Sequence, residues 1–190
     1  DSMMSLYIGK LNIINPEVIS YYEAAIMIPV SYNGVKGNYM PVLYLDRALP
    51  ITLGREIWGF PKFQAEVSME VQEGVVRASV KKAETTLIDV TLQFGEPIPP
   101  RFSSTSNVIL LKSIPSVRGD STYDVRQLTT ALLHSRKVSE VYPGEAKLSF
   151  SSTVSDPVGM IPVIGFVGGF YVVGSFVLDY GEVIYDYLSK

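Results

Sequence analysis

Lys62 is the residue of this sequence whose setting best suits covalent chemistry. It lies in the segment Gly54–Phe63, which reads GREIWGFPKF, directly after Pro61. Three aromatic residues stand close to it in the sequence: Trp58, Phe60 and Phe63. Proline restricts the local backbone, and a group of rings excludes water, which disfavours the charged form of an amine. A neutral amine held in one place is a nucleophile that can form a Schiff base with a ketone.

The same lysine also admits a purely structural interpretation. A lysine beside aromatic rings commonly extends its amine to solvent or rests it on a ring face as a cation–π contact. Side chains alternate between the two faces of a strand, so Lys62 is expected on the side of Gln64 and Glu66, opposite the apolar face. Spacing alone therefore does not bury the amine, and both roles stay open.

Composition excludes most other kinds of reactive or binding site. The 190 residues contain no cysteine, so disulfides, thiolate catalysis, zinc fingers and iron–sulfur clusters are excluded. His134 is the single histidine and cannot build a multi-histidine metal site alone, and we expect neither a metal nor an organic cofactor. The formal net charge is −3 and no run of Lys or Arg stands out, which argues against nucleic acid and anionic membranes as partners.

The elements that must position this lysine are predicted to be mostly β-strands. Polar and apolar residues alternate through Gln64–Phe94, which indicates a meander of strands with a turn at Gln72–Gly74. Two apolar runs, Ala24–Tyr32 and Val35–Leu45, are joined at Asn33-Gly34, which is a strong hairpin signal. Lys62 is therefore expected to follow a hairpin and to lead into a meander.

One short helix is predicted just before the lysine, from Pro50 to Trp58. Pro50 suits a first helical turn, Gly59 suits a helix end, and Pro61 prevents continuation. Further strands are expected at Val108–Ile114, Tyr123–Leu133, Val138–Tyr142 and Ala146–Phe150, with a turn at Pro143-Gly144 between the last two.

The stretch Pro157–Leu178 carries no charge and is long enough to span a bilayer. Its glycines, its β-branched and aromatic residues and its acidic flanks favour two buried strands that meet at Gly168-Gly169 instead. Many short strands without a repeat or a linker predict a single all-β domain over residues 1–190, mainly antiparallel with one or two short helices, built as a barrel or sandwich. The first residues do not resemble a signal peptide, so we expect a cytoplasmic protein.

Several segments resemble acetoacetate decarboxylases, in the same order: Ile28–Tyr39 (IPVSYNGVKGNY), Leu43–Asp46, Gly54–Glu56 and Pro61-Lys62. The segment Glu182–Leu188 is similar to the C-terminus of that family, and the middle of the chain, including Leu111–Pro115, fits more loosely. The resemblance therefore covers nearly the whole chain. It implies an acetoacetate decarboxylase-like β-barrel or cone with a surrounding sheet and a largely apolar pocket.

The resemblance also implies three site residues: the Schiff-base lysine Lys62, the supporting carboxylate Glu23 and the pocket aromatic Phe60. Trp58 and Phe63 are expected to contact the substrate as well. Two roles stay open for Arg55, which either orients a substrate carboxylate or forms an ion pair at the helix end. The family's lysine is usually followed by a second lysine, where this chain has Phe63. The family also carries an active-site arginine on an N-terminal segment, and this sequence starts after the point where that segment would lie.

We therefore expect a lyase that converts acetoacetate, or a close β-keto acid, to a ketone and CO₂ through a Schiff base on Lys62. One alternative is a Schiff-base aldolase or dehydratase that acts on keto acids. Another is a non-catalytic barrel that binds small apolar ligands. The apolar, weakly charged C-terminal third and the resemblance both predict a homo-oligomer.

Overall fold

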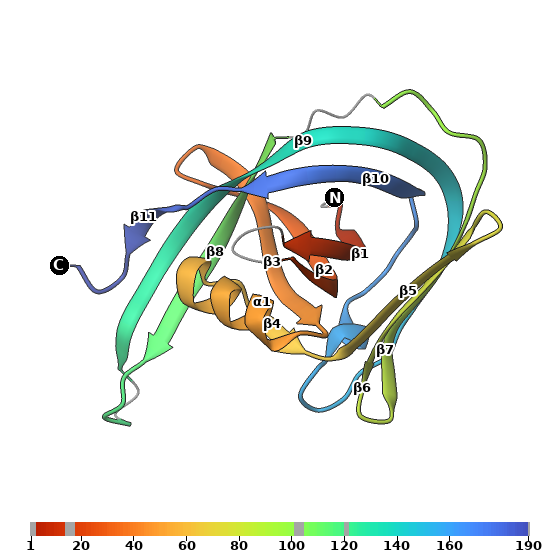
Figure 1. Ribbon diagram of the computed structural model, residues 1–190. Coiled ribbons are helices and arrows are strands. Elements are labelled where there is room, and N and C mark those ends of the chain that lie inside the picture. Colours follow the sequence, from red (N-terminus) through yellow and green to blue (C-terminus); the bar gives the residue numbers. More distant parts are fainter. Residues whose placement is uncertain (1–2, 14–17, 101–104, 120–121, 190) are drawn as a thin grey trace.

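Strands dominate the computed structural model, which describes residues 3–13, 18–100, 105–119 and 122–189 (Figure 1). Along these residues the elements are β1 (Ser5–Ile13), β2 (Ile19–Tyr32), β3 (Val35–Leu45), α1 (Ala48–Leu53), the π-helical turn η1 (Gly54–Trp58), β4 (Lys62–Gln64), β5 (Glu66–Gln72), β6 (Val75–Lys82), β7 (Thr85–Phe94), β8 (Thr105–Pro115), β9 (Tyr123–Phe150), the 3-10 turn η2 (Val158–Met160), β10 (Gly169–Leu178) and β11 (Glu182–Asp186). The predicted all-β class with a short helix is confirmed.

The strands form one mixed sheet within the described ranges. Its order is β1-β2-β3-β8-β9-β7-β6-β5, with β4 beside β3 and with β10 and β11 beside β9. Most neighbours are antiparallel, but β3 runs parallel to β4 and, through the pair Asn38–Val108, to β8. The sheet curls so that β1 and β2 contact β5 (Figure 1). No ladder joins β1 to β5 among the described residues, so the strands form a curled sheet that is not closed by hydrogen bonds at these two strands.

Turn chemistry produces the tight hairpins predicted from the sequence. Asn33 and Gly34, between β2 and β3, have φ values of 46° and 84°. Glu73 and Gly74, between β5 and β6, have φ values of 50° and 78°. Two consecutive residues with positive φ make the turn whose twist matches that of paired strands, and glycine adopts this conformation without strain. The β2–β3 hairpin and the β5–β6–β7 meander are therefore confirmed.

β9 runs without interruption where the sequence predicted three strands and a turn at Pro143-Gly144. Gly144 pairs with Gly169 of β10 on one side and with β7 on the other. A Cβ atom added at Gly144 would collide with the carbonyl oxygen of Gln93 in β7. The glycine therefore permits the close approach of a neighbouring strand, and the Pro-Gly pair does not turn the chain.

The uncharged stretch Pro157–Leu178 contains one strand, β10, so the predicted pair of buried strands is wrong. Residues 161–168 have no regular structure and lie outside the sheet. Large apolar side chains of this stretch are exposed, among them Ile164, Phe166, Val167, Phe170 and Phe176. Apolar composition alone does not distinguish a buried strand from an exposed apolar segment. None of the helices in the described ranges is long and apolar enough to cross a membrane.

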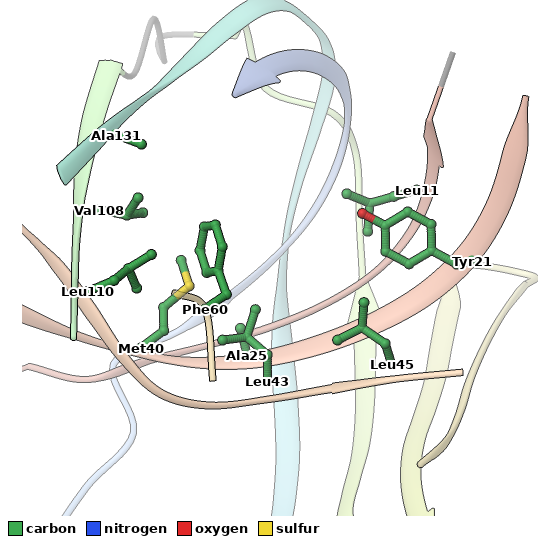
Figure 2. Close-up of a cluster of buried hydrophobic side chains, with 10 residues drawn as sticks. All are labelled: Leu11, Tyr21, Ala25, Met40, Leu43, Leu45, Phe60, Val108, Leu110 and Ala131. Carbon is green, nitrogen blue, oxygen red and sulfur yellow. The ribbon is translucent and has the colours of Figure 1, made fainter. Parts of the chain in front are cut away.

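Most of the buried apolar side chains form two clusters. The Phe60 cluster comprises Leu11, Tyr21, Ala25, Met40, Leu43, Leu45, Phe60, Val108, Leu110 and Ala131, with Phe60 in the middle of the group (Figure 2). The Tyr44 cluster comprises Ala24, Ile26, Tyr44, Ala65, Val67, Val80, Leu87, Ile88 and Val158. β2 and β3 contribute to both clusters because alternate residues of a strand point to opposite faces. Leu43 and Leu45 therefore face one cluster, and Tyr44 between them faces the other.

Candidate functional site

The chain reaches Lys62 through α1 and η1, which form one continuous helical segment. The helix predicted over Pro50–Trp58 is confirmed, with an earlier start at Ala48. Gly59 ends the segment with a φ of 89°, a left-handed conformation that favours glycine. A Cβ atom at Gly59 would also stand 2.6 Å from the Cβ of Lys112 in β8. Backbone conformation and space therefore both require glycine at this bend.

Lys62 is the first residue of β4 and is buried, with 9% of its surface exposed. It pairs with Leu43 of β3, whose side chain belongs to the Phe60 cluster. Phe63 and Gln64 are both exposed, whereas Ala65, between β4 and β5, is buried. Two consecutive exposed residues break the strand alternation. The expectation that Lys62 lies opposite the apolar face is therefore wrong, because the chain changes phase where β4 gives way to β5.

Glu23 lies in β2, close to the amine of Lys62. The distance from Glu23 Oε2 to Lys62 Nζ is 3.4 Å, and the two side chains are only 13% and 10% exposed. Oε2 is buried and accepts no hydrogen bond from the described residues. A carboxylate oxygen in this position can accept a hydrogen bond or a proton from a molecule bound at the amine. The structure thus brings together the two residues that the sequence analysis singled out for catalysis.

Aromatic rings surround this pair. The Lys62 Nζ atom lies 5.3 Å from the ring centroid of Phe60 and 6.0 Å from that of Tyr21. Burial, reinforced by the negative charge of Glu23, raises the pKa of the Tyr21 hydroxyl and that of the Tyr7 hydroxyl above the ordinary tyrosine value. Both phenols are therefore neutral hydrogen-bond donors at neutral pH.

The sequence analysis missed both tyrosines. Tyr21 precedes Glu23 by one strand period, so period-two spacing along β2 is a signal that could have found it. Tyr7 pairs with Ala25, and its strand β1 was not predicted. A residue on an unpredicted strand cannot be assigned to a face, so no signal in the sequence alone points to Tyr7.

Arg55 and Phe63 do not lie at the amine. Arg55 is exposed, and its Nη1 donates a hydrogen bond to the backbone carbonyl of Lys62 at 3.2 Å. Phe63 is 44% exposed, and the guanidinium carbon of Arg55 and the amine of Lys82 lie 5.9 and 5.8 Å from its ring centroid. The two residues thus form a cation–π contact on the side of β4 away from the buried lysine.

Trp58 stands behind Phe60, and no contact joins it to the amine in the described part of the chain. Its ring lies 6.4 Å from that of Phe60 and stacks on Tyr180 at 6.0 Å. The indole Nε1 donates a hydrogen bond to the backbone oxygen of Asp179 at 2.9 Å. Trp58 therefore packs against the Phe60 cluster from outside and helps to hold Phe60 in place.

The interior around Lys62 offers an amine, a carboxylate and two phenols in apolar surroundings. Two surface hollows lie elsewhere, of about 310 and 130 Å³, and neither is lined by Lys62 or Glu23. The larger is lined by apolar residues of β9 and of the segment that follows it, such as Leu148, Phe150 and Ile161. Within the described ranges, no three His, Asp or Glu side chains are placed to hold a metal ion.

Comparison with known proteins identifies a family that covers almost the whole chain. Residues 3–188 match the family model described as acetoacetate decarboxylase (ADC). The chain belongs to the acetoacetate decarboxylase family. An acetoacetate decarboxylase of Burkholderia ambifaria is 33% identical over 181 residues, which cover 90% of this chain and 70% of that relative. Membership of this family supports an enzyme of the decarboxylase type.

Solved structures of known proteins superpose well on this fold. The crystal structure of acetoacetate decarboxylase from Legionella pneumophila superposes with a TM-score of 0.87 at 28% identity, covering 97% of this chain and 75% of that one. The enduracididine biosynthesis enzyme MppR, solved in complex with pyruvate, superposes with a TM-score of 0.75 at 16% identity, covering 91% of this chain and 70% of that one. The likeness to MppR concerns the fold alone.

Proposed function

We propose that this chain decarboxylates acetoacetate, or a close β-keto acid, through a Schiff base on Lys62. One observation carries the proposal: the amine of Lys62 is buried in an apolar interior, 3.4 Å from the carboxylate of Glu23. A buried lysine next to a carboxylate is uncommon unless the pair has a structural or chemical role. Membership of the acetoacetate decarboxylase family favours the chemical role.

The reaction follows from the chemistry of the amine. Nζ in its neutral form attacks the ketone carbon of the substrate, and loss of water gives a cationic iminium. The bond between the carboxylate carbon and the adjacent carbon then breaks, its electron pair moves towards the iminium nitrogen, and CO₂ leaves an enamine. A proton is added to the enamine carbon, and water hydrolyses the resulting iminium to a ketone and the free amine. Acetoacetate thus gives acetone and CO₂.

Each proton transfer in this sequence has a group close at hand. Glu23 Oε2, which accepts no hydrogen bond from the described residues, relays the protons: it accepts one from Nζ during attack and one from water during hydrolysis, and it returns protons to the departing hydroxyl and to the enamine carbon. The one proton consumed in each turnover comes from solvent. The neutral phenols of Tyr7 and Tyr21 donate hydrogen bonds to a bound molecule, and the raised pKa of each keeps its proton in place. Phe60 gives a bound substrate an apolar neighbour. Apolar surroundings disfavour the charged carboxylate relative to neutral CO₂, and this favours decarboxylation.

Reductive trapping tests the proposal directly. Incubation with acetoacetate and borohydride is expected to add one reduced adduct, which peptide mass mapping locates on Lys62. Lys62→Ala should lose both the adduct and the release of CO₂. Lys36→Ala, at an exposed lysine of β3, is the matched control and should keep both.

Other outcomes of the same assay assign other functions. An adduct on Lys36 or Lys81 would refute the role of Lys62. Condensation of pyruvate with an aldehyde on Lys62, without decarboxylation of acetoacetate, would assign an aldolase or dehydratase. The complete absence of an adduct with either substrate would favour a non-catalytic ligand-binding protein.

A further inference from the structure

Gly54 lies against the side chain of Lys62. A Cβ atom added to it would stand 2.7 Å from both Cδ and Cε of Lys62 and 3.1 Å from Nζ. The backbone of Gly54 is right-handed and helical, with a φ of −64° and a ψ of −41°, so any residue could adopt it. Alanine is also the better helix former of the two. Conformation therefore does not explain a glycine here, whereas the space occupied by the lysine does.

Gly54 is held in this position by its own backbone. Its carbonyl oxygen accepts hydrogen bonds from the amides of Gly59 and Phe60, both at 3.1 Å. These bonds close the helical segment onto the residues that lead into Pro61 and Lys62. The glycine cannot retreat from the amine without breaking them. The flexible end of the lysine side chain would therefore yield to a larger residue, and the backbone would stay.

We propose that Gly54 is a positioning residue, which keeps open the volume where the Lys62 amine stands beside Glu23 and forms its Schiff base. The inference rests on the proposed function of Lys62. Carbon atoms in favourable contact lie about 3.5–4.0 Å apart, so a methyl group at position 54 would displace the lysine methylenes by about 1 Å. A misplacement of about 1 Å in a reacting group can lower its rate by about 10²-fold.

The test is the variant Gly54→Ala, compared with the parent chain and with Gly95→Ala as the control. A Cβ atom at Gly95 meets no other atom within 4 Å, and its φ is not positive. In Gly54→Ala, kcat with acetoacetate and the rate of borohydride trapping on Lys62 should both fall by about 10²-fold. KM should change much less, because the apolar lining is untouched. The chain should stay folded, with a thermal unfolding midpoint close to that of the parent, because the gain in helix propensity offsets part of the cost of displacing the lysine side chain. Gly95→Ala should change none of these quantities.

A second comparison separates space for the lysine from a role in folding. In the Lys62→Ala background the long side chain is absent, so adding Gly54→Ala should raise the thermal midpoint there, which it does not do in the parent. A parent-like trapping rate in Gly54→Ala, or an unfolded Gly54→Ala chain, would overturn the inference. Failure to trap any adduct on Lys62 of the parent would instead refute the proposed function.

Discussion

Asp156 is a buried acid outside the candidate site, and its carboxylate joins several segments of the chain. It is 5% exposed and accepts hydrogen bonds from Lys82 Nζ at 2.9 and 2.8 Å, from Tyr44 Oη at 3.1 Å and from Ser155 Oγ at 2.6 Å. These bonds attach the segment after β9 to β3 and β6. We therefore expect Asp156→Ala to lower the free energy of unfolding.

The size of the effect follows from what each partner loses. Tyr44 is 1% exposed, and a buried hydroxyl left without an acceptor costs about 1–3 kcal/mol. The Lys82 side chain is 34% exposed and regains water, so loss of its ion pair contributes only about 0.2–1 kcal/mol. The free energy of unfolding is therefore expected to fall by about 1–4 kcal/mol. A domain of typical stability, about 5–15 kcal/mol, stays folded after such a loss.

Urea unfolding at neutral pH measures this difference, with Tyr44→Phe as the matched variant. Tyr44→Phe removes the hydroxyl together with its need for an acceptor, so it should cost less than Asp156→Ala. In the double variant, the cost of Asp156→Ala should shrink, because no orphaned hydroxyl remains. An equal cost of Asp156→Ala in both backgrounds would refute the assignment of the penalty to Tyr44.

The pH dependence gives a second check. Burial alone would raise the pKa of Asp156, but hydrogen bonds from Lys82, Ser155 and Tyr44 lower it below the ordinary value of 3.8. A carboxyl whose pKa is lower in the folded state stabilises the protein above its unfolded-state pKa, and this stabilisation is lost as the pH falls through the folded-state pKa. The stability difference between the parent and Asp156→Ala should therefore be full at pH 7 and should shrink below about pH 4. A difference that stays constant into acid would contradict the reasoning.

Three further predictions concern the site and its surroundings. Glu23→Gln should lower turnover of acetoacetate by about 10²-fold or more, because it removes a proton acceptor, and steady-state kinetics measures this; normal turnover would exclude the role. Phe63→Leu should leave the trapping rate on Lys62 within about twofold, since exposed side chains away from a site have small effects, and a large loss would place Phe63 in the site. The chain should self-associate through exposed apolar residues such as Phe170 and Phe176, so light scattering should give a mass above the 21.0 kDa of one chain; a monomer at micromolar concentration would refute this.

Local chemistry explains which elements were predictable from the sequence. The turn at Asn33-Gly34 depends on residues that tolerate positive φ, and it forms where it was predicted. The helix before Lys62 depends on Pro50 and Gly59, and it too was found. Each of these features is set by a few neighbouring residues, so a single sequence contains the information.

Features that depend on distant strands were not predictable. Pro143-Gly144 reads as a turn, but the glycine is required because β7 approaches it closely. The burial of Lys62 depends on its pairing with Leu43 and on the change of phase at Ala65, which alternation within one strand does not reveal. Within the site, the resemblance to a family identified Lys62 and Glu23. The places of Tyr7 near Glu23 and of Gly54 against Lys62 depend on how distant segments pack, which the sequence alone does not reveal.

The uninterrupted course of β9 has a consequence for how the chain folds. This strand forms a hairpin with β8, which directly precedes it, but its other partners β7, β10 and β11 are distant in the sequence. The β2–β3 hairpin and the β5–β6–β7 meander also close over short stretches of sequence. Pairing between distant segments must overcome a loss of chain entropy before any contact compensates for it, so chains with high contact order fold slowly. The local hairpins can therefore form first, and the pairing of β9 with β7, β10 and β11 should set the folding rate. Amides at the centre of β9 should be among the last to exchange with solvent, because they open only when the long-range sheet does.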